Sequence, residues 1–243
     1  MPTGINASEF WLLAPELIVT LFACLALVVD IVAGRGRGRW TALFSLTGIG
    51  FALVSTGILY YDYHGSERSA FNRMVVVDDY ALFFKFLFLI TAAFAILIAV
   101  RYLDVEERQS GEYYALILFA TLGMMLMAAG TDLLTLYVSL ELMAIAVYVL
   151  VGYLRSDRKS NEAAMKYFLL GAFSSGIMLY GISLFYGAAA STNLADISTA
   201  VNQLSAFKNE IEALYQSGRI SKADRDAIVA AADRQIAAIQ AGA

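Results

Sequence analysis

The stretch DLLTLYVSLELMAIAVYVLVGYL, from Asp132 to Leu154, places one carboxylate, Glu141, among aliphatic and aromatic residues on both sides. A helix of about 20 apolar residues crosses a hydrocarbon core roughly 30 Å thick, and this stretch has that length. It therefore predicts a membrane-spanning helix with an ionisable group near its middle. Such a group costs on the order of 2.5–3.5 kcal/mol even by insertion scales, so another interaction must offset that cost.

The composition of the whole chain also favours a membrane environment. Of its 243 residues, 60% are hydrophobic and only 16% are charged, whereas a soluble domain has about 25% charged residues. Six apolar runs are long enough to span a bilayer, namely residues 10–33, 40–61, 80–100, 113–129, 133–154 and 163–187. We expect an all-α integral membrane protein whose six transmembrane helices form a membrane domain over residues 1–194.

Positive charge is distributed unevenly between the loops on the two sides of these spans. One set of loops contains Arg68 and Arg73, and the other contains eight basic residues, which are Arg35, Arg37, Arg39, Arg101, Arg108, Arg155, Arg158 and Lys159. Short loops rich in Lys and Arg face the cytoplasm. The pattern therefore predicts that the N-terminus lies outside the cytoplasm.

The chain changes character at about residue 195. Apolar residues recur there at helical spacing in two segments, Gly218 is suited to ending the first helix, and Ser221 with Asp224 resembles a capping box for the second. Residues 195–243 are thus predicted to form a soluble, amphipathic helical hairpin. Basic and acidic residues balance from residue 202 onward, so nothing in the tail favours nucleic-acid binding.

The predicted fifth span places further polar groups on the face of Glu141. Tyr137 and Tyr148 lie four residues before and seven residues after the carboxylate, and Ala144 lies between them. This pattern indicates an interior polar lane that could carry protons. The alternative is a permanently protonated glutamic acid that only hydrogen-bonds a neighbouring helix.

Lys166 is a second candidate in the spans. It lies about one turn inside the predicted cytoplasmic end of the sixth span, where Glu162, four residues earlier, offers an ordinary helical ion pair. Glu141 is ~20 Å from that end of its own helix and Lys166 only ~6 Å, so we expect no contact between them. From the residues alone, the local ion pair is slightly favoured.

Three other charges lie close to predicted span ends. Glu16 follows Pro15 at the start of the first span, Asp30 is near its end, and Lys85 is about a turn and a half inside the third. We expect all three to face the membrane interfaces. In the sixth span, small residues four apart predict a close helix approach, with Gly171 and Ser175 as one pair and Ala172 and Gly176 as another.

Several motifs together resemble the amino-terminal half of subunit N, an antiporter-like subunit of bacterial respiratory complex I, the proton-translocating NADH:quinone oxidoreductase. They are APELIVTL followed by LALVVD, then VVVDDYALFFKFLF, FATLGMM running into the Glu141 stretch, and EAAMKYFLLGAFSSGIMLYGISLFYG. The pairing of Glu141 in LEL with Lys166 in AAMKYF, 25 residues later, is the most specific part. The resemblance covers roughly residues 10 to 200.

This resemblance implies a place for the chain in the bacterial inner membrane. Glu141 and Lys166 become proton-path residues, with Tyr137 and Tyr148 beside them, and the partners are the other membrane-arm subunits and the lipid bilayer. The sequence has no glycine-rich dinucleotide fingerprint, cysteine cluster or haem-ligand arrangement. We therefore expect no catalytic, metal-ligating or cofactor-binding residues on this chain, with NADH, FMN, iron-sulfur clusters and quinone in partner subunits.

The sequence departs from the family after residue 200. Family members continue into a seventh helix that carries a lysine and into a second repeat, whereas here the predicted hairpin follows. Three explanations stay open: a truncated or split gene product, a hairpin inserted ahead of missing spans, or a separate chain that supplies the second half. Two further hypotheses stand beside complex I: a subunit of a related multi-subunit cation/proton antiporter, which shares the helix-five glutamate, and a truncated, non-conducting membrane scaffold.

Overall fold

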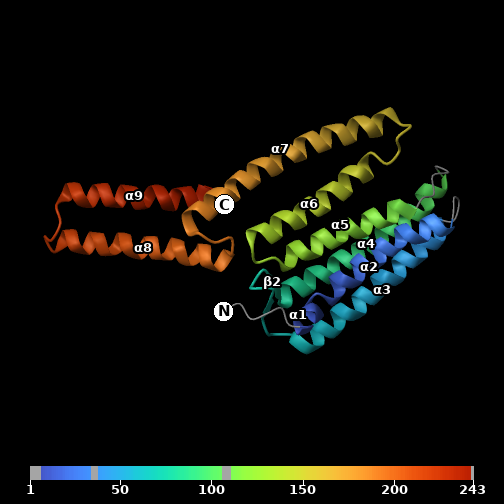
Figure 1. Ribbon diagram of the computed structural model, residues 1–243, viewed down its shortest axis with the longest axis horizontal. Coiled ribbons are helices and arrows are strands. Elements are labelled where there is room, and N and C mark those ends of the chain that lie inside the picture. Colours follow the sequence, from blue (N-terminus) through green and yellow to red (C-terminus); the bar gives the residue numbers. More distant parts are fainter. Residues whose placement is uncertain (1–6, 34–37, 106–110, 242–243) are drawn as a thin grey trace. The chain divides into compact units, whose positions relative to one another are not determined.

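The computed structural model describes residues 7–33, 38–105 and 111–241, which are almost entirely helical (Figure 1). In chain order the elements are α1 (Ala7–Leu12), α2 (Ala14–Ala33), α3 (Gly38–Tyr63), β1 (Arg68–Ala70), β2 (Val75–Val77), α4 (Asp79–Val105), α5 (Gly111–Ala129), α6 (Leu133–Val151), α7 (Arg158–Ala189), α8 (Leu194–Gln216) and α9 (Lys222–Ala241).

Within these residues, α2 to α7 are the six helices long and apolar enough to cross a membrane. The predicted all-α membrane fold with six spans and a following helical hairpin is therefore confirmed. The first run, predicted as one helix from residue 10, is instead broken at Leu13, between α1 and α2. Pro15 explains this break, because proline has no backbone N–H to donate and is tolerated only in the first turn of a helix.

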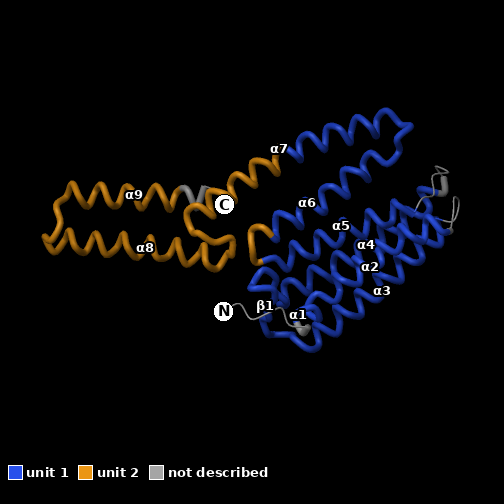
Figure 2. The backbone as a smooth tube through the Cα atoms, in the orientation of Figure 1, with its two compact units in different colours: residues 1–130, 135–172 blue, residues 131–134, 173–243 orange. Residues whose placement is uncertain are grey.

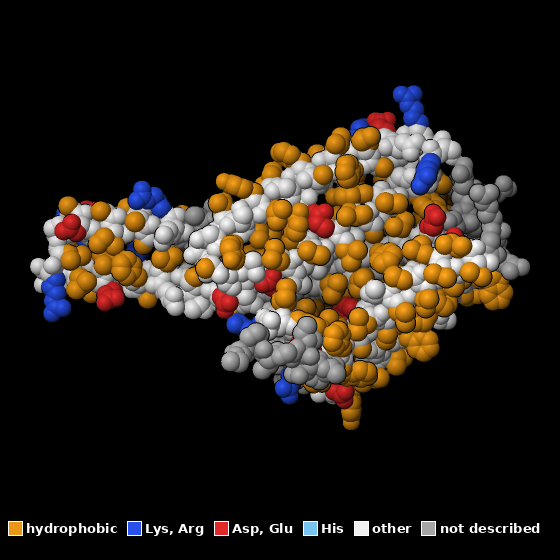
Figure 3. All heavy atoms as spheres, viewed as in Figure 1, with side chains coloured by type: hydrophobic (Ala, Val, Ile, Leu, Met, Phe, Trp, Pro, Cys, Tyr) orange, Lys and Arg blue, Asp and Glu red, His pale blue; other side chains and the backbone are white. Residues whose placement is uncertain are grey.

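The chain folds into two compact units (Figure 2). Unit 1 contains residues 1–130 and 135–172, and unit 2 contains residues 131–134 and 173–243. In Figure 3, hydrophobic side chains cover much of the helical surface of unit 1 on the face shown. An apolar helix surface of this kind suits contact with lipid or with other membrane helices.

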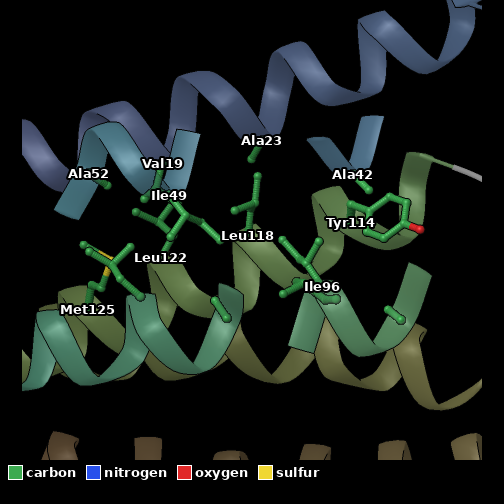
Figure 4. Packing of buried hydrophobic residues seen from close by; sticks show 14 of the residues in the cluster. Val19, Ala23, Ala42, Ile49, Ala52, Ile96, Tyr114, Leu118, Leu122 and Met125 are labelled. Atoms are coloured by element: carbon green, nitrogen blue, oxygen red, sulfur yellow. The ribbon is translucent and has the colours of Figure 1, made fainter. Parts of the chain in front are cut away.

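The core of unit 1 lies between α2, α3, α4 and α5. Helix α2 packs against α3 and α5, and α4 packs against the same two helices. Apolar side chains from all four helices interlock in this core, as Figure 4 shows for Val19, Ile49, Ile96 and Leu118. In the most apolar stretch of α5 half of the residues are buried, compared with 11% in α7, so α5 is central and α7 peripheral.

Gly123 permits a close approach of α5 and α6. A Cβ atom at this position would lie 2.7 Å from both the Ser139 carbonyl oxygen and the Met143 amide nitrogen of α6. Any larger residue would therefore push the two helix backbones apart. Small residues at such crossings are the usual means of bringing membrane helices together.

A small antiparallel hairpin of β1 and β2 lies between α3 and α4, and the sequence analysis did not predict it. Arg68 pairs with Val77 and Ala70 with Val75. All three residues of β2 are buried, and the Glu9 side chain accepts a hydrogen bond from the Phe71 amide at 2.9 Å. The hairpin thus packs against the end of the bundle where α2 and α4 begin.

Unit 2 is joined by hydrogen bonds between two turns of the chain. The Thr192 hydroxyl donates to Asp132 Oδ2 at 2.6 Å, the Leu133 amide donates to the Thr192 carbonyl at 2.8 Å, and the Leu194 amide donates to the Thr131 carbonyl at 3.0 Å. Phe185 and Ile197 share a buried cluster. Unit 2 consequently includes the second half of α7, from Phe173 onward, and the domain boundary at residue 195 stays a prediction.

Helices α8 and α9 pack together as the predicted amphipathic hairpin. Gly218 adopts a φ of 73°, a left-handed conformation that favours glycine. The Asp224 amide donates to Ser221 Oγ at 3.2 Å, which is the contact expected from a capping box. Lys208 and Asp233 connect the two helices through an ion pair of 2.6 Å.

Candidate functional site

Helix α6 carries Glu141 eight residues after its first residue, Leu133. At about 1.5 Å per residue, the carboxylate lies ~12 Å along the helix. Its side chain is half-buried, and Oε1 is enclosed without a hydrogen-bond partner among the described residues. Buried polar atoms are normally paired, so this oxygen is a place where a water molecule could bind.

The two tyrosines predicted beside Glu141 are also half-buried on α6. The Tyr148 ring meets the edges of Tyr167 and Phe168 in α7, with ring centroids 5.0 and 5.8 Å away. Its hydroxyl lies over Gly171, where a Cβ atom would overlap it. Gly171 therefore does allow a close approach, made by a tyrosine side chain of α6.

Lys166 is exposed to the surroundings of the helix bundle, whereas Glu141 is half-buried. Lys166 lies on α7, and its Nζ is 2.6 Å from Glu162 Oε1 in the helical ion pair predicted from the sequence. The structure records no hydrogen bond or ion pair between Lys166 and Glu141, and both residues lie in the described part of the chain. Their role as a proton path stays a prediction.

Glu16 and Lys85 do not face the membrane interfaces, and that prediction is wrong. Lys85 Nζ lies 2.7 Å from Glu16 Oε1, and the two side chains are 0% and 3% exposed. The ion pair connects α2 to α4 inside the core of unit 1. Asp30, the third residue of the group, accepts a hydrogen bond from the Gly111 amide at 2.7 Å and so caps the start of α5.

The sequence contained a signal for this pair. Glu16 and Lys85 are the third residue of α2 and the seventh of α4, and both helices start at the same side of the membrane in the predicted topology. Opposite charges at similar depths in two spans can neutralise each other. Only the packing of α2 and α4 against α3 and α5, around a common core, turned these charges inward.

The described residues contain no group of three or more His, Cys, Asp or Glu side chains that could hold a metal ion. Cys24 is exposed and unpaired. The arrangement that the structure does present consists of ionisable groups inside or beside apolar helices. Such groups can hold and release protons.

Comparisons with known proteins give a consistent picture. A family described as NADH:quinone oxidoreductase/Mrp antiporter, TM, matches residues 130–221. NADH-quinone oxidoreductase subunit N 1 of Koribacter versatilis is 47% identical over 209 residues, which cover 84% of this chain and 41% of that protein. Subunit N of Trichlorobacter lovleyi is 46% identical over 198 residues, which cover 80% of this chain and 39% of that protein.

Solved structures show the same relationship. A chain of respiratory complex I from Thermus thermophilus is 27% identical, with a TM-score of 0.63 over 77% of this chain and 41% of that chain. A chain of an archaeal membrane-bound sulfane sulfur reductase shares the fold, with a TM-score of 0.65 over 80% of this chain and 40% of that chain, at 23% identity. This chain spans about two fifths of the length of the curated relatives it matches.

Proposed function

From the homology of this chain to subunit N of NADH-quinone oxidoreductase over 209 residues, we propose that it translocates protons in the membrane arm of such a complex. The relatives are subunits of an enzyme complex, and the chain itself is a multi-pass membrane protein. Quinone reduction by partner subunits would drive the proton movement.

The enclosed oxygen Oε1 of the half-buried Glu141 is the observation that carries this proposal. Its Oε1 has no hydrogen-bond partner among the described residues, although it lies inside an apolar helix. Ionisable side chains inside membrane helices commonly belong to proton relays. A neighbouring cation that moves could couple such a relay to quinone reduction in partner subunits.

Glu141 lies in α6 and Lys166 in α7. Lys166 is proposed to act nearer the cytoplasmic ends of these two helices than Glu141. Its exposed ammonium is held by Glu162 at 2.6 Å, so it is available to water and to a neighbouring subunit. Tyr137 and Tyr148 would support proton movement along α6 through their hydroxyls, which both donate and accept hydrogen bonds. The cation that modulates Glu141 would come from a neighbouring chain or from a segment corresponding to the rest of the relatives' length.

We also propose a membrane location, an orientation and partner subunits for the chain. The excess of basic residues in one set of loops favours an N-terminus outside the cytoplasm, in a bacterial inner membrane. We propose that NADH, FMN, iron-sulfur clusters and quinone bind to partner subunits. The other membrane-arm subunits and the lipid bilayer would then cover the apolar surfaces of α6 and α7, which expose Val138, Ile145, Phe168, Leu169 and Leu170.

Replacement of Glu141 by glutamine tests the proposal. Glutamine keeps the size and much of the hydrogen bonding but cannot titrate, so we expect an assembled complex with proton pumping, and the quinone reduction coupled to it, abolished or greatly reduced. Glu210→Gln on the exposed surface of α8 is the matched control and should pump normally. Normal pumping by Glu141→Gln would leave Glu141 as interhelical glue or the chain as a non-conducting scaffold.

A second candidate is a subunit of a multi-subunit cation/proton antiporter, because the matching family includes Mrp antiporters. Affinity purification of the chain from its native membrane separates the two. Recovery with NADH- or quinone-reducing subunits supports the respiratory complex. Recovery without them, together with sodium-driven proton movement in vesicles, supports the antiporter.

A further inference from the structure

The buried ion pair of Glu16 and Lys85 lies between two apolar layers. On the side where α2 and α4 begin are Leu12 and Leu82, which share one buried cluster. On the other side are Val19 and Leu89, which belong to the main core and are fully buried. Two charged groups are thus held at 2.7 Å in surroundings that offer little else to solvate them.

Most hydrogen-bond donor and acceptor positions of this pair have no partner among the described residues. A lysine ammonium has three donors and a carboxylate has about four acceptor positions. The contact between Nζ and Oε1 is an ion pair without hydrogen-bond alignment, and Glu16 Oε2 has no partner among the described residues. The pair has spare positions to which water molecules could bind.

Stability alone does not account for these charges. Removing two charges from water is costly, and well-packed apolar residues often stabilise a protein as much as a buried ion pair or more. A membrane interior makes the comparison less favourable still, because charged groups are rare there and usually have a function. The charged state of Glu16 and Lys85 therefore serves a function other than stability.

We propose that Glu16 and Lys85 form a second proton-exchanging site of this membrane domain, separate from the face of α6 that carries Glu141. This inference rests on the proposed proton translocation. It adds a site in the bundle of α2 to α5, formed by two residues that were expected only at the membrane interfaces.

The exchange is a proton transfer that balances within the pair. A proton leaves Lys85 Nζ and binds Glu16 Oε1, so an N–H bond breaks, an O–H bond forms, and a neutral amine faces a neutral acid. Water then accepts the proton from the acid, and a hydronium ion returns a proton to the amine. The ion pair is restored after one proton has passed through it.

The depth of the pair suits exchange with one side of the membrane. Glu16 and Lys85 lie ~3 and ~9 Å from the starts of their helices, compared with ~12 Å for Glu141 in α6. All three helices start at the same side, which is the outer side in the proposed orientation. The pair is therefore closer to the outer aqueous phase than Glu141 is.

Lys85→Arg is the most discriminating variant. Arginine keeps the positive charge opposite Glu16 but does not give up a proton in proteins. We expect the complex to assemble and its NADH-driven pumping to fall by roughly tenfold or more, as for loss of a proton-transfer group. The charge-free double variant Glu16→Gln with Lys85→Met should show the same loss and avoids leaving one charge buried alone.

The exposed pair Lys208–Asp233 supplies a matched control, with the same kinds of group at 2.6 Å outside the spans. The double variant Lys208→Met with Asp233→Asn should pump normally. Infrared difference spectra recorded on addition of NADH give a direct readout, in which the carboxylic acid band of Glu16 should change during turnover and disappear in Glu16→Gln.

The outcomes separate this inference from the proposed function. If Glu141→Gln stops pumping but Lys85→Arg and the double variant pump normally, the second site is wrong and the first stands. If neither Lys85→Arg nor the double variant assembles, the pair is a structural clamp and the inference is overturned. If pumping is unaffected by Glu141→Gln, the proposed role of Glu141 fails, and the infrared band of Glu16 still decides whether the pair exchanges protons.

Discussion

Two lysine–glutamate pairs in this membrane domain have almost the same geometry and opposite surroundings. Lys85 and Glu16 are 2.7 Å apart and 0% and 3% exposed, whereas Lys166 and Glu162 are 2.6 Å apart and 70% and 58% exposed. The first pair connects two helices, and the second lies along one helix. The distance between charged atoms therefore says little about what a pair contributes, and burial says much more.

The first prediction compares the loss of one lysine from each pair. Lys85→Met leaves the Glu16 carboxylate buried without its partner and should lower the free energy of unfolding by about 3–5 kcal/mol. Lys166→Met removes an exposed ion pair and should lower it by about 0–1 kcal/mol. Thermal and denaturant unfolding of the purified variants in one detergent measures both changes. Equal losses would contradict the role given to burial.

A second prediction concerns a tight contact on a largely exposed helix. Gly171→Ala places a methyl group on the Tyr148 hydroxyl, so we expect a loss of about 1–3 kcal/mol from overpacking. Gly176→Ala, whose Cβ would meet nothing within 4 Å, should instead gain roughly 0.5–1 kcal/mol. Unfolding midpoints measure the difference, and a gain in both variants would show that α6 and α7 separate freely at this point.

Much of the fold could be predicted because hydrophobic length is encoded locally. The six apolar runs predicted the spans to within five residues at each end, and the largest shifts are at the end of α4, Val105 rather than residue 100, and at the start of α7, Arg158 rather than residue 163. The ion pair of Glu162 and Lys166 could also be predicted, because residues four apart meet on any helix. The contact between Ser221 and Asp224 could also be predicted, because a capping box joins residues three apart at the start of a helix.

The contacts that the sequence analysis missed depend on which helices are neighbours. Glu16 and Lys85 are far apart in sequence, and their burial follows from the packing of α2 and α4 around a common core. The strands β1 and β2 have three residues each, too few to show an alternating pattern. Helical periodicity describes one helix at a time and carries no information on such contacts.

A third prediction tests whether the exposed pair has a role in transport. Lys166→Ala should slow proton pumping several-fold while assembly changes less, and Lys166→Arg should recover part of the rate because it restores the positive charge. This partial recovery would contrast with Lys85→Arg, in which charge without a transferable proton is expected to fail. If Glu162→Ala reproduces the whole defect of Lys166→Ala, the local ion pair accounts for the effect.

A small effect, comparable to that of Lys166→Met, is expected for the third lysine–carboxylate pair, which lies outside the spans. Lys208 and Asp233 are 2.6 Å apart and 40% and 50% exposed, so Asp233→Asn should cost about 0.2–1 kcal/mol. The cost should fade at high salt, because screening weakens exposed charges most. Amide hydrogen exchange in α8 and α9 at low and high salt measures it. A cost as large as that of Lys85→Met, or one unaffected by salt, would mean that burial does not set the order of these three pairs.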